Sequence, residues 1–244
     1  MQERDTPSGV LPPDRDATPA ATVLAVRDVE GSLEVLMVQR NSRGPFGSMW
    51  VYPGGQVDNA DRRAVTAAEA ERHTPDVAAA RHAAVREARE EAGIMIDVDR
   101  LTALSFWLPP PEAARRFATW FFLAEVDFEA QVRVDGAEIH DFEWITPHAA
   151  MAARNSAKMG MAPPTYMTLW WLSAHRDTAS AVAAARREGI QRFETKMVSA
   201  VAGGPPATVW EGDAAFGDGN LDRPGPRRRL IMSDPEWLVE VSTA

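Results

Sequence analysis

Alternating and continuous runs of apolar residues predict β-strands in the first quarter of the chain. Two runs rich in β-branched residues, ATVLAVRDV (21–29) and LEVLMVQR (33–40), flank a Glu30-Gly31-Ser32 turn. Such a pattern is typical of a β-hairpin. A shorter run, MWVY (49–52), predicts a third strand that stops at Pro53-Gly54-Gly55, because proline and glycine interrupt regular structure.

Three later apolar runs carry several aromatic residues, which favours strands over helices. They lie at residues 101–108, 117–126 and 140–146. Their aromatic residues either pack in a core or form a wall for a nucleobase or an acyl chain. The residues concerned are Trp107, Phe117, Trp120, Phe121 and Phe122.

Helical patterns separate and follow these strands. Alanine and arginine dominate the stretch from about Val77 to Ala92, and both residues favour helices. Thr74 or Asp76 is the expected N-terminal cap, and Gly93 the expected stop. Further helices are expected at 147–155, 164–174 and 177–187. The order of strands, one long helix, strands and helices predicts an α+β fold, a mixed α/β sandwich with a partly antiparallel sheet.

The two ends of the chain differ in composition from the middle. Residues 1–20 contain four prolines and many charges, so we expect a flexible tail. Residues 21–202 are expected to form the main domain. Residues 203–244 are rich in Gly, Pro and Asp and are expected to be loop with one hairpin, between 207–212 and 228–232, packed on the same domain.

The overall charge narrows the list of partners. The chain has 26 Lys and Arg against 35 Asp and Glu, a net charge of −9, which argues against nucleic acid or an anionic membrane as the main partner. It has no cysteine, so thiolate metal sites and a cysteine nucleophile are excluded. No apolar run reaches the length of a membrane span, and no secretory signal core is present. We therefore expect a cytoplasmic protein.

The motif REAREEAGI at residues 86–94 has the clearest chemical meaning. On a helix, Glu87, Glu90 and Glu91 share the face opposite a narrow stripe of alanines. Such clustered oxygen ligands suit Mg²⁺ or Mn²⁺, and we expect at least one carboxyl pKa to be raised by its like-charged neighbours. The alternative is an exposed acidic face on a helical interaction protein.

These residues resemble the signature of the Nudix hydrolases, G-x5-E-x7-R-E-U-x-E-E-x-G-U, in which U is apolar. The resemblance covers roughly residues 21–150. Arg86 follows the glycine by 31 positions instead of 14, so an insertion is expected at about 58–75. Counting back eight positions from Arg86 places Ala78 where the family has its first Glu. The matching residues are Gly55, Arg86, Glu87, Glu90, Glu91, Gly93 and Ile94.

The resemblance implies a Nudix fold, with a mixed sheet between helices and extra C-terminal helices at about 147–200. It also implies a Mg²⁺- or Mn²⁺-dependent pyrophosphohydrolase, which cleaves a nucleoside diphosphate linked to another moiety with water as the nucleophile. Arg86 orients a helix carboxylate, and Glu138 is the expected loop base, with Glu143 as second choice. The implied metal contacts are Glu87, Glu90, Glu91 and the carbonyl of Gly55, and the implied catalytic residues are Glu87, Glu138 and Arg86.

The sequence leaves several small molecules as candidate substrates. WVYPGGQVD, the insertion and RRFATWFFLAEV resemble the branch of coenzyme A and acyl-coenzyme A diphosphatases, whose products are 3′,5′-ADP and (acyl-)phosphopantetheine. The alternatives are ADP-ribose, NADH or nucleotide sugars, or a catalytically silent Nudix-fold protein that binds a nucleotide. A homodimer is compatible with the resemblance. The expected substrate-binding residues are Arg40, Arg43 and Arg116.

Overall fold

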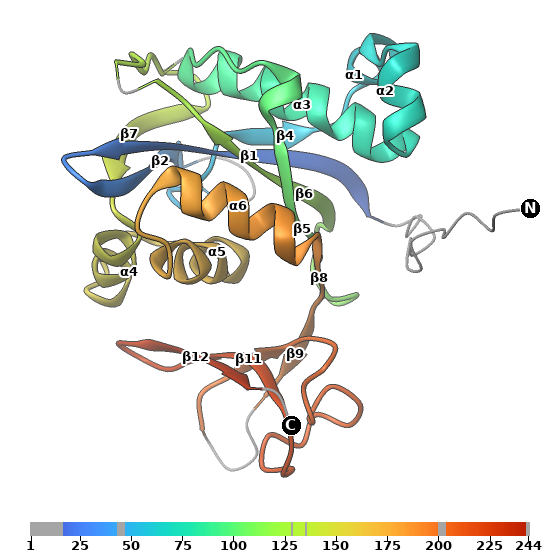
Figure 1. Cartoon of the computed structure of the whole chain (residues 1–244). Helices are drawn as coiled ribbons and strands as arrows, with labels where there is room; N and C mark the ends of the chain where they lie inside the picture. The colour runs from blue at the N-terminus through green and yellow to red at the C-terminus, as the bar shows by residue number, and fades with distance from the viewer. Residues whose placement is uncertain (1–16, 43–46, 128, 135, 200–203, 243–244) are drawn as a thin grey trace, which may run out of the picture.

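The predicted hairpin forms the middle of a large mixed sheet in the computed structural model (Figure 1), which describes residues 17–42, 47–127, 129–134, 136–199 and 204–242. Strand β1 (Thr18–Val29) runs antiparallel to β2 (Ser32–Arg40). Gly31 in the turn has a φ of 81°, a left-handed conformation that glycine adopts without strain. The strand includes Thr18 to Ala20, so the tail expected over residues 1–20 is wrong at that end. Its residues 1–16 lie outside the described ranges.

The main sheet has eight strands. Six lie in the order β3-β2-β1-β6-β5-β8, while β4 pairs with β1 and β7 pairs with β2. The pairs β1–β6 and β5–β8 are parallel and the others are antiparallel, so the mixed α/β prediction is confirmed. The remaining strands are β3 (Trp50–Val51), β4 (Gly54–Gln56), β5 (Thr102–Leu108), β6 (Phe117–Glu125), β7 (Ile139–Ile145) and β8 (Gln191–Glu194).

Helices cover both faces of this sheet (Figure 1). On one face lies α3 (Pro75–Ala92), with α1 (Asn59–Ala64) and α2 (Ala67–Arg72) beside its N-terminal end. A short 3-10 helix, Val98–Arg100, follows α3. The other face carries α4 (Pro147–Asn155), α5 (Pro163–Ser173) and α6 (Thr178–Glu188). In the described ranges no helix is long and apolar enough to cross a membrane.

Helix α3 packs closely on the sheet because its inner face is made of alanines. Ala80, Ala83, Ala84 and Ala88 are buried against strand residues such as Phe122. The helix begins at Pro75, two residues before the predicted start, with Thr74 as its cap. Gly93 ends it in the left-handed conformation, as predicted.

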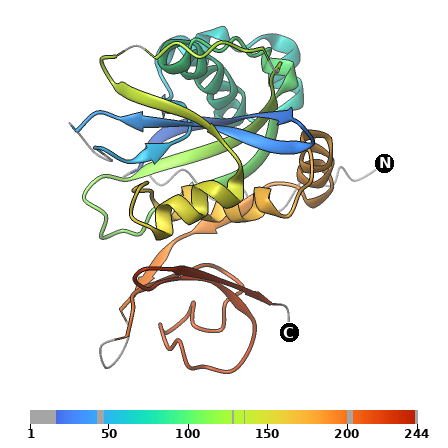
Figure 2. The same cartoon turned by 90° about the vertical axis from the view of Figure 1, so that its left-hand side faces the viewer.

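A second, four-stranded antiparallel sheet occupies the C-terminal part of the chain. Its order is β12-β11-β10-β9, and Figure 2 shows it as a separate layer beside the helices. Only the pairing of β10 with β11 was predicted, so the expected loop and single hairpin is wrong. Thr195 alone separates β8 of the main sheet from β9. The strands are β9 (Lys196–Val198), β10 (Ala207–Val209), β11 (Arg227–Met232) and β12 (Trp237–Ser242).

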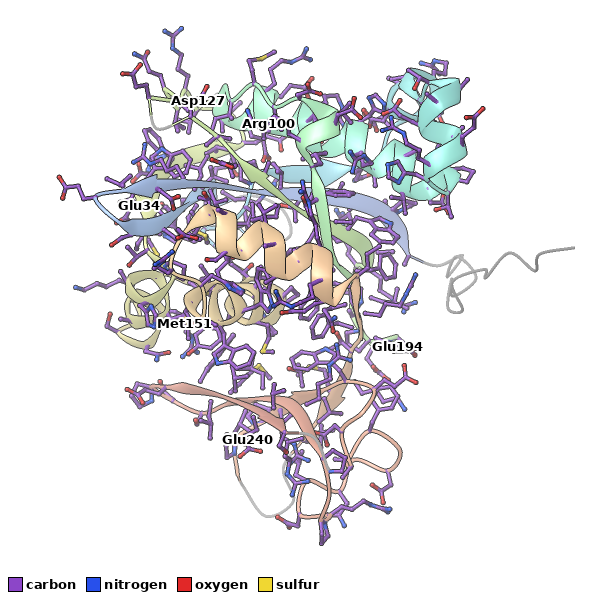
Figure 3. All side chains as sticks on the ribbon, in the orientation of Figure 1. Glu34, Arg100, Asp127, Met151, Glu194 and Glu240 are labelled. Carbon is purple, nitrogen blue, oxygen red and sulfur yellow. The ribbon has the colours of Figure 1, made fainter. Side chains whose placement is uncertain are left out.

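Side chains fill the space between this second sheet and the main fold (Figure 3). Trp210 and Leu230 are fully buried in the same core cluster as residues of the main sheet, and Met151 of α4 packs against that cluster. Trp107 of β5 stacks on Phe193 of β8, with ring centroids 3.9 Å apart. The two layers therefore share one apolar core.

Candidate functional site

Two glycines on β4 bring the sheet into direct contact with the last turns of α3. The third strand, β3, ends before Pro53 as predicted, but the sequence did not predict that Gly54 and Gly55 begin a new strand, which pairs with Ala21 and Thr22 of β1. A Cβ added to Gly55 would lie 2.3 Å from Glu87 Oε1, and one added to Gly54 would lie 2.6 Å from the Ala21 carbonyl oxygen. Only glycine allows this close approach.

Glu91 is the buried carboxylate of the site. The residue is 4 % exposed, accepts a hydrogen bond of 2.9 Å from the Gly54 backbone N–H, and pairs with Arg40 at 3.2 Å. Burial raises the pKa of Glu91 to about 7, against the opposing effects of Gly54 and Arg40. A raised carboxyl pKa was expected, but its largest cause is burial, and repulsion from Glu87 and Glu138 adds less.

Arg86 joins four polar groups from different parts of the chain. Its guanidinium donates to both Asp61 oxygens at 3.0 Å, to Glu87 at 2.7 Å and to Glu90 at 3.1 Å. It also donates to the Gln56 carbonyl at 2.9 Å. The hydrogen bonds that Arg86 donates to Asp61 contribute most to a raised pKa of Arg86, which stays charged. Burial also raises the pKa of Glu87, even though Arg86 opposes this.

Asp61 is a site residue that the sequence analysis missed. The first Glu of the Nudix signature was assigned to Ala78 by counting back from Arg86, but Ala78 is fully buried in the alanine face of α3. Counting forward six positions from Gly55 instead reaches Asp61, which pairs with Arg86 through both oxygens. The forward count in the sequence therefore contained the signal.

Glu138 lies opposite α3, just before β7. Arg40 bridges it to Glu91, with one guanidinium nitrogen 2.9 Å from Glu138 Oε2 and the other on Glu91. Arg40 was expected to bind substrate, and in the structure it also joins these two carboxylates. Glu143, the second choice for the base, lies within β7 opposite Met37 and does not line the cavity described below.

The three helix carboxylates differ in exposure, which the helical pattern did not predict. Side-chain exposure is 5 % for Glu91, 14 % for Glu87 and 49 % for Glu90. The face opposite the alanine stripe therefore points partly toward β4 and does not lie wholly in solvent. Burial of unevenly paired carboxylates is unfavourable and marks a site where a cation is stabilising.

The donor set fits a divalent cation. Glu87, Glu90, Glu91 and Glu138 offer hard oxygens, and the Glu87 carboxylate lies against the Gly55 backbone. Within the described residues, no three acidic or histidine side chains are grouped closely enough to hold a metal as they stand. Arg40 and Arg86 bridge these carboxylates, so a bound cation requires the carboxylates to change partners.

A cavity of about 930 Å³ adjoins these carboxylates. It lies where β1 and β6 begin and β5 ends, and it extends from α3 to the second sheet. Its apolar walls come from β5, β6, the start of α5 and the second sheet. They include Trp107, Phe117, Phe121, Pro163, Pro164 and Met197.

Comparison with known proteins gives the family. The model of the NUDIX domain matches residues 16–165, well over half of the chain. This chain belongs to the Nudix family. "Putative nudix hydrolase 7" of Caenorhabditis elegans is 25% identical over an alignment of 194 residues, and the match covers 65% of this chain and 61% of that relative. The chain therefore matches about three fifths of the length of this curated relative.

Comparison with solved structures also gives the fold. A NUDIX hydrolase from Alicyclobacillus acidocaldarius superimposes with a TM-score of 0.61 at 23% identity, covering 69% of this chain and 96% of that chain. An Ap4A hydrolase from C. elegans gives a TM-score of 0.46 at 20% identity, covering 65% and 96%. The first likeness confirms the Nudix fold predicted from the sequence.

The expected substrate-binding arginines are not all brought to the Nudix cavity. Arg40 lines it, whereas the Arg116 guanidinium donates to the Pro109 carbonyl at 3.0 and 3.2 Å. The neighbouring Arg115 lines the cavity instead. Arg43 lies outside the described residues. The aromatic belt is divided, because Phe122 packs in the core under α3 while Trp107, Phe117 and Phe121 line the cavity.

Proposed function

We propose that this Nudix chain is a Mg²⁺- or Mn²⁺-dependent pyrophosphohydrolase, which cleaves a nucleoside diphosphate linked to another moiety. The observation that carries the proposal is the buried Glu91, surrounded by Glu87, Glu138 and the Gly54 N–H beside a large cavity. A carboxylate with a pKa near neutrality in a cleft is typical of a functional site. A silent homologue has no need to keep these acids.

Each side chain has a proposed role. Glu87 and Glu91 hold the cation, with Glu90 and the Gly55 carbonyl as further contacts. When bound, a divalent cation neutralises the pyrophosphate and activates water. Glu138 accepts a proton of the attacking water as the oxygen of that water bonds to phosphorus. The bridging P–O bond of the pyrophosphate breaks, and its electron pair leaves with the departing phosphate. Arg86, fixed by Asp61, orients the Glu87 carboxylate.

We infer that Asp61 takes the place of the first signature Glu. The 17 additional residues then fall between Asp61 and Arg86, in α2 and the first turns of α3. The expected insertion at about 58–75 is thereby moved toward the C-terminus. His82 of α3 lies 3.0 Å from Glu69 of α2 and fixes the added helix to α3.

For the substrate we propose coenzyme A or an acyl derivative, giving 3′,5′-ADP and (acyl-)phosphopantetheine. The support is the resemblance of the sequence to that branch and the apolar part of the cavity wall. ADP-ribose, NADH and nucleotide sugars are the competing substrates. Incubating the protein and Mg²⁺ or Mn²⁺ with each compound separates them, and rapid cleavage of another compound without coenzyme A turnover removes this assignment.

The activity itself is tested by Glu91→Gln. We expect kcat to fall at least ~10²-fold, because the variant loses a charged cation ligand while keeping the shape of the side chain. Glu71→Gln, on the exposed side of α2, is the matched control and is expected to keep full activity. Circular dichroism checks the fold, and calorimetric titration with Mn²⁺ checks cation binding independently. Undiminished activity in Glu91→Gln would mean that α3 is not the catalytic centre.

A further inference from the structure

The second sheet contributes side chains to the same cavity as the catalytic carboxylates. Met197 of β9 and Thr208 of β10 both line it. They are directly opposed in the β9–β10 register, so they share one face of the sheet. These strands lie beyond residue 165, where the match to the Nudix domain ends. This wall is therefore an addition to the family domain.

Met197 is an apolar side chain that the fold leaves uncovered. It is 50% exposed, although Thr208 opposite it is only 1% exposed. Trp107, 3% exposed, and Phe121, 6% exposed, line the same cavity. Contact with an apolar ligand removes such a surface from water and is therefore favourable. The flexible methionine side chain also adapts to apolar ligand groups of different shape.

Thr208 presents an unsatisfied polar atom at the same wall. Its hydroxyl is buried and has no hydrogen-bond partner among the described residues. The hydroxyl of Thr195, which also lines the cavity, instead accepts a hydrogen bond of 3.1 Å from Trp210 Nε1. A buried hydroxyl without a partner is unfavourable, so a ligand group that bonds it is stabilising.

The aromatic rings of the wall favour an aliphatic chain over a nucleobase. Trp107 already stacks on Phe193, with an interplanar angle of 3°, and meets Trp210 edge-on at 5.6 Å. Phe121 meets Tyr52 edge-on at 6.2 Å. These rings already have aromatic partners within the protein, whereas the flexible Met197 side chain of the wall is half exposed.

We propose that Met197 and Thr208 form a chain subsite. It binds an extended aliphatic group on the half of the diphosphate substrate that does not carry the nucleoside. An amide or hydroxyl within that group bonds the Thr208 hydroxyl. The proposal rests on the proposed function, because the same cavity contains the carboxylates. It assigns chain selectivity to the second sheet and cleavage to α3.

Equilibrium binding tests the subsite without turnover. Dissociation constants for coenzyme A, hexanoyl-coenzyme A, dodecanoyl-coenzyme A and ADP-ribose are measured in the presence of a chelator. We expect Met197→Trp, which fills the subsite, to weaken binding of the dodecanoyl compound at least tenfold and to change ADP-ribose less than twofold. Thr208→Val keeps the shape and removes the hydroxyl, and is expected to weaken all three coenzyme A compounds about fivefold. Met95→Trp, at a 76% exposed methionine outside the cavity lining, is the matched control.

Two results would overturn the subsite. One is an equal change of affinity for ADP-ribose and dodecanoyl-coenzyme A in Met197→Trp, and the other is no change for either compound. Failure of the proposed function looks different. In that case the unmodified protein and Glu91→Gln hydrolyse every diphosphate at the same rate. The dissociation constants still report on the subsite.

Discussion

Two clusters of arginine and carboxylate, each with a buried carboxylate, have opposite character in this molecule. Beside the second sheet, Arg229 of β11 and Asp213 form a buried pair, with contacts of 2.6 and 2.8 Å and side-chain exposures of 3% and 0%. At the α3 site, two arginines face a larger number of carboxylates beside a cavity. The carboxylates are Asp61, Glu87, Glu90, Glu91 and Glu138.

The pKa directions reflect this difference in balance. Burial alone raises the pKa of Asp213, but hydrogen bonds from Arg229 and from the Arg228 and Ala215 N–H groups outweigh it and lower the value. At Glu91 burial prevails and raises the pKa to about 7. A balanced pair compensates its own charges, so that only the removal of one partner is strongly unfavourable, whereas an excess of buried carboxylate needs a proton or a cation. Glu91 and Asp213 are both buried, so burial alone does not distinguish a structural ion pair from a binding site.

The largest expected effect is at the balanced pair. Asp213→Asn leaves the buried Arg229 charge with only the distant Glu240 carboxylate, at 3.9 Å, as an ion-pair partner, and is expected to lower the free energy of unfolding by about 3–5 kcal/mol. Urea denaturation followed by fluorescence measures this, because Trp210 lies in the adjoining core. Asp218→Asn breaks the exposed pair with Arg223 and is the control, with an expected change below about 1 kcal/mol. Equal losses in the two variants would contradict the distinction.

The second effect is a gain in the free energy of unfolding, expected for Glu91→Gln, and its size depends on pH. Because the folded-state pKa of Glu91 is about 7 and its ordinary value is 4.5, the folded protein holds an extra proton between these values. Stability therefore falls as the pH rises from about 4.5 to 7, by about 3 kcal/mol in total. In chelator-treated protein, Glu91→Gln is expected to be more stable than the unmodified chain at pH 8, and this advantage is expected to shrink toward pH 5.

Thermal unfolding at several pH values measures this difference. Glu90→Gln is the control, since its side chain is half exposed, and no comparable gain at pH 8 is expected. The contribution of Asp213 to stability has the opposite dependence on pH. Its lowered pKa gives stability that is present above the ordinary value of 3.8 and is lost only as the pH falls through the folded value. The deficit of Asp213→Asn is therefore expected to stay constant from pH 5 to 8, and a similar pH dependence in both variants would show that the clusters are alike.

The same comparison explains what the sequence predicted. Strands, helices and the carboxylates of α3 follow from local apolar patterns and from a contiguous motif, and these predictions are confirmed or retained. Asp61 was missed because its partner Arg86 is 25 positions away in sequence, and the added residues were counted from one end only. Strand β9 has only three residues, too few to show an alternating pattern. The apolar run of β12, which forms a local hairpin with β11, was not recognised in the sequence. The sequence therefore predicted the carboxylates but not the second wall of their cavity.

The smallest expected effect tests whether the arginine contacts at α3 matter for activity. Asp61→Asn weakens the hold on Arg86, so that its guanidinium binds Glu87 more strongly and competes with the cation. We expect about a tenfold loss of activity, equivalent to about 1.4 kcal/mol, at limiting Mn²⁺ and recovery when Mn²⁺ is raised. Asp76→Asn, which breaks only the exposed pair with Arg62, is the matched control and is expected to leave the Mn²⁺ dependence unchanged. A loss that excess Mn²⁺ does not recover would instead assign Asp61 to stability, as at Asp213, and the distinction between the two clusters would then rest on Glu91 alone.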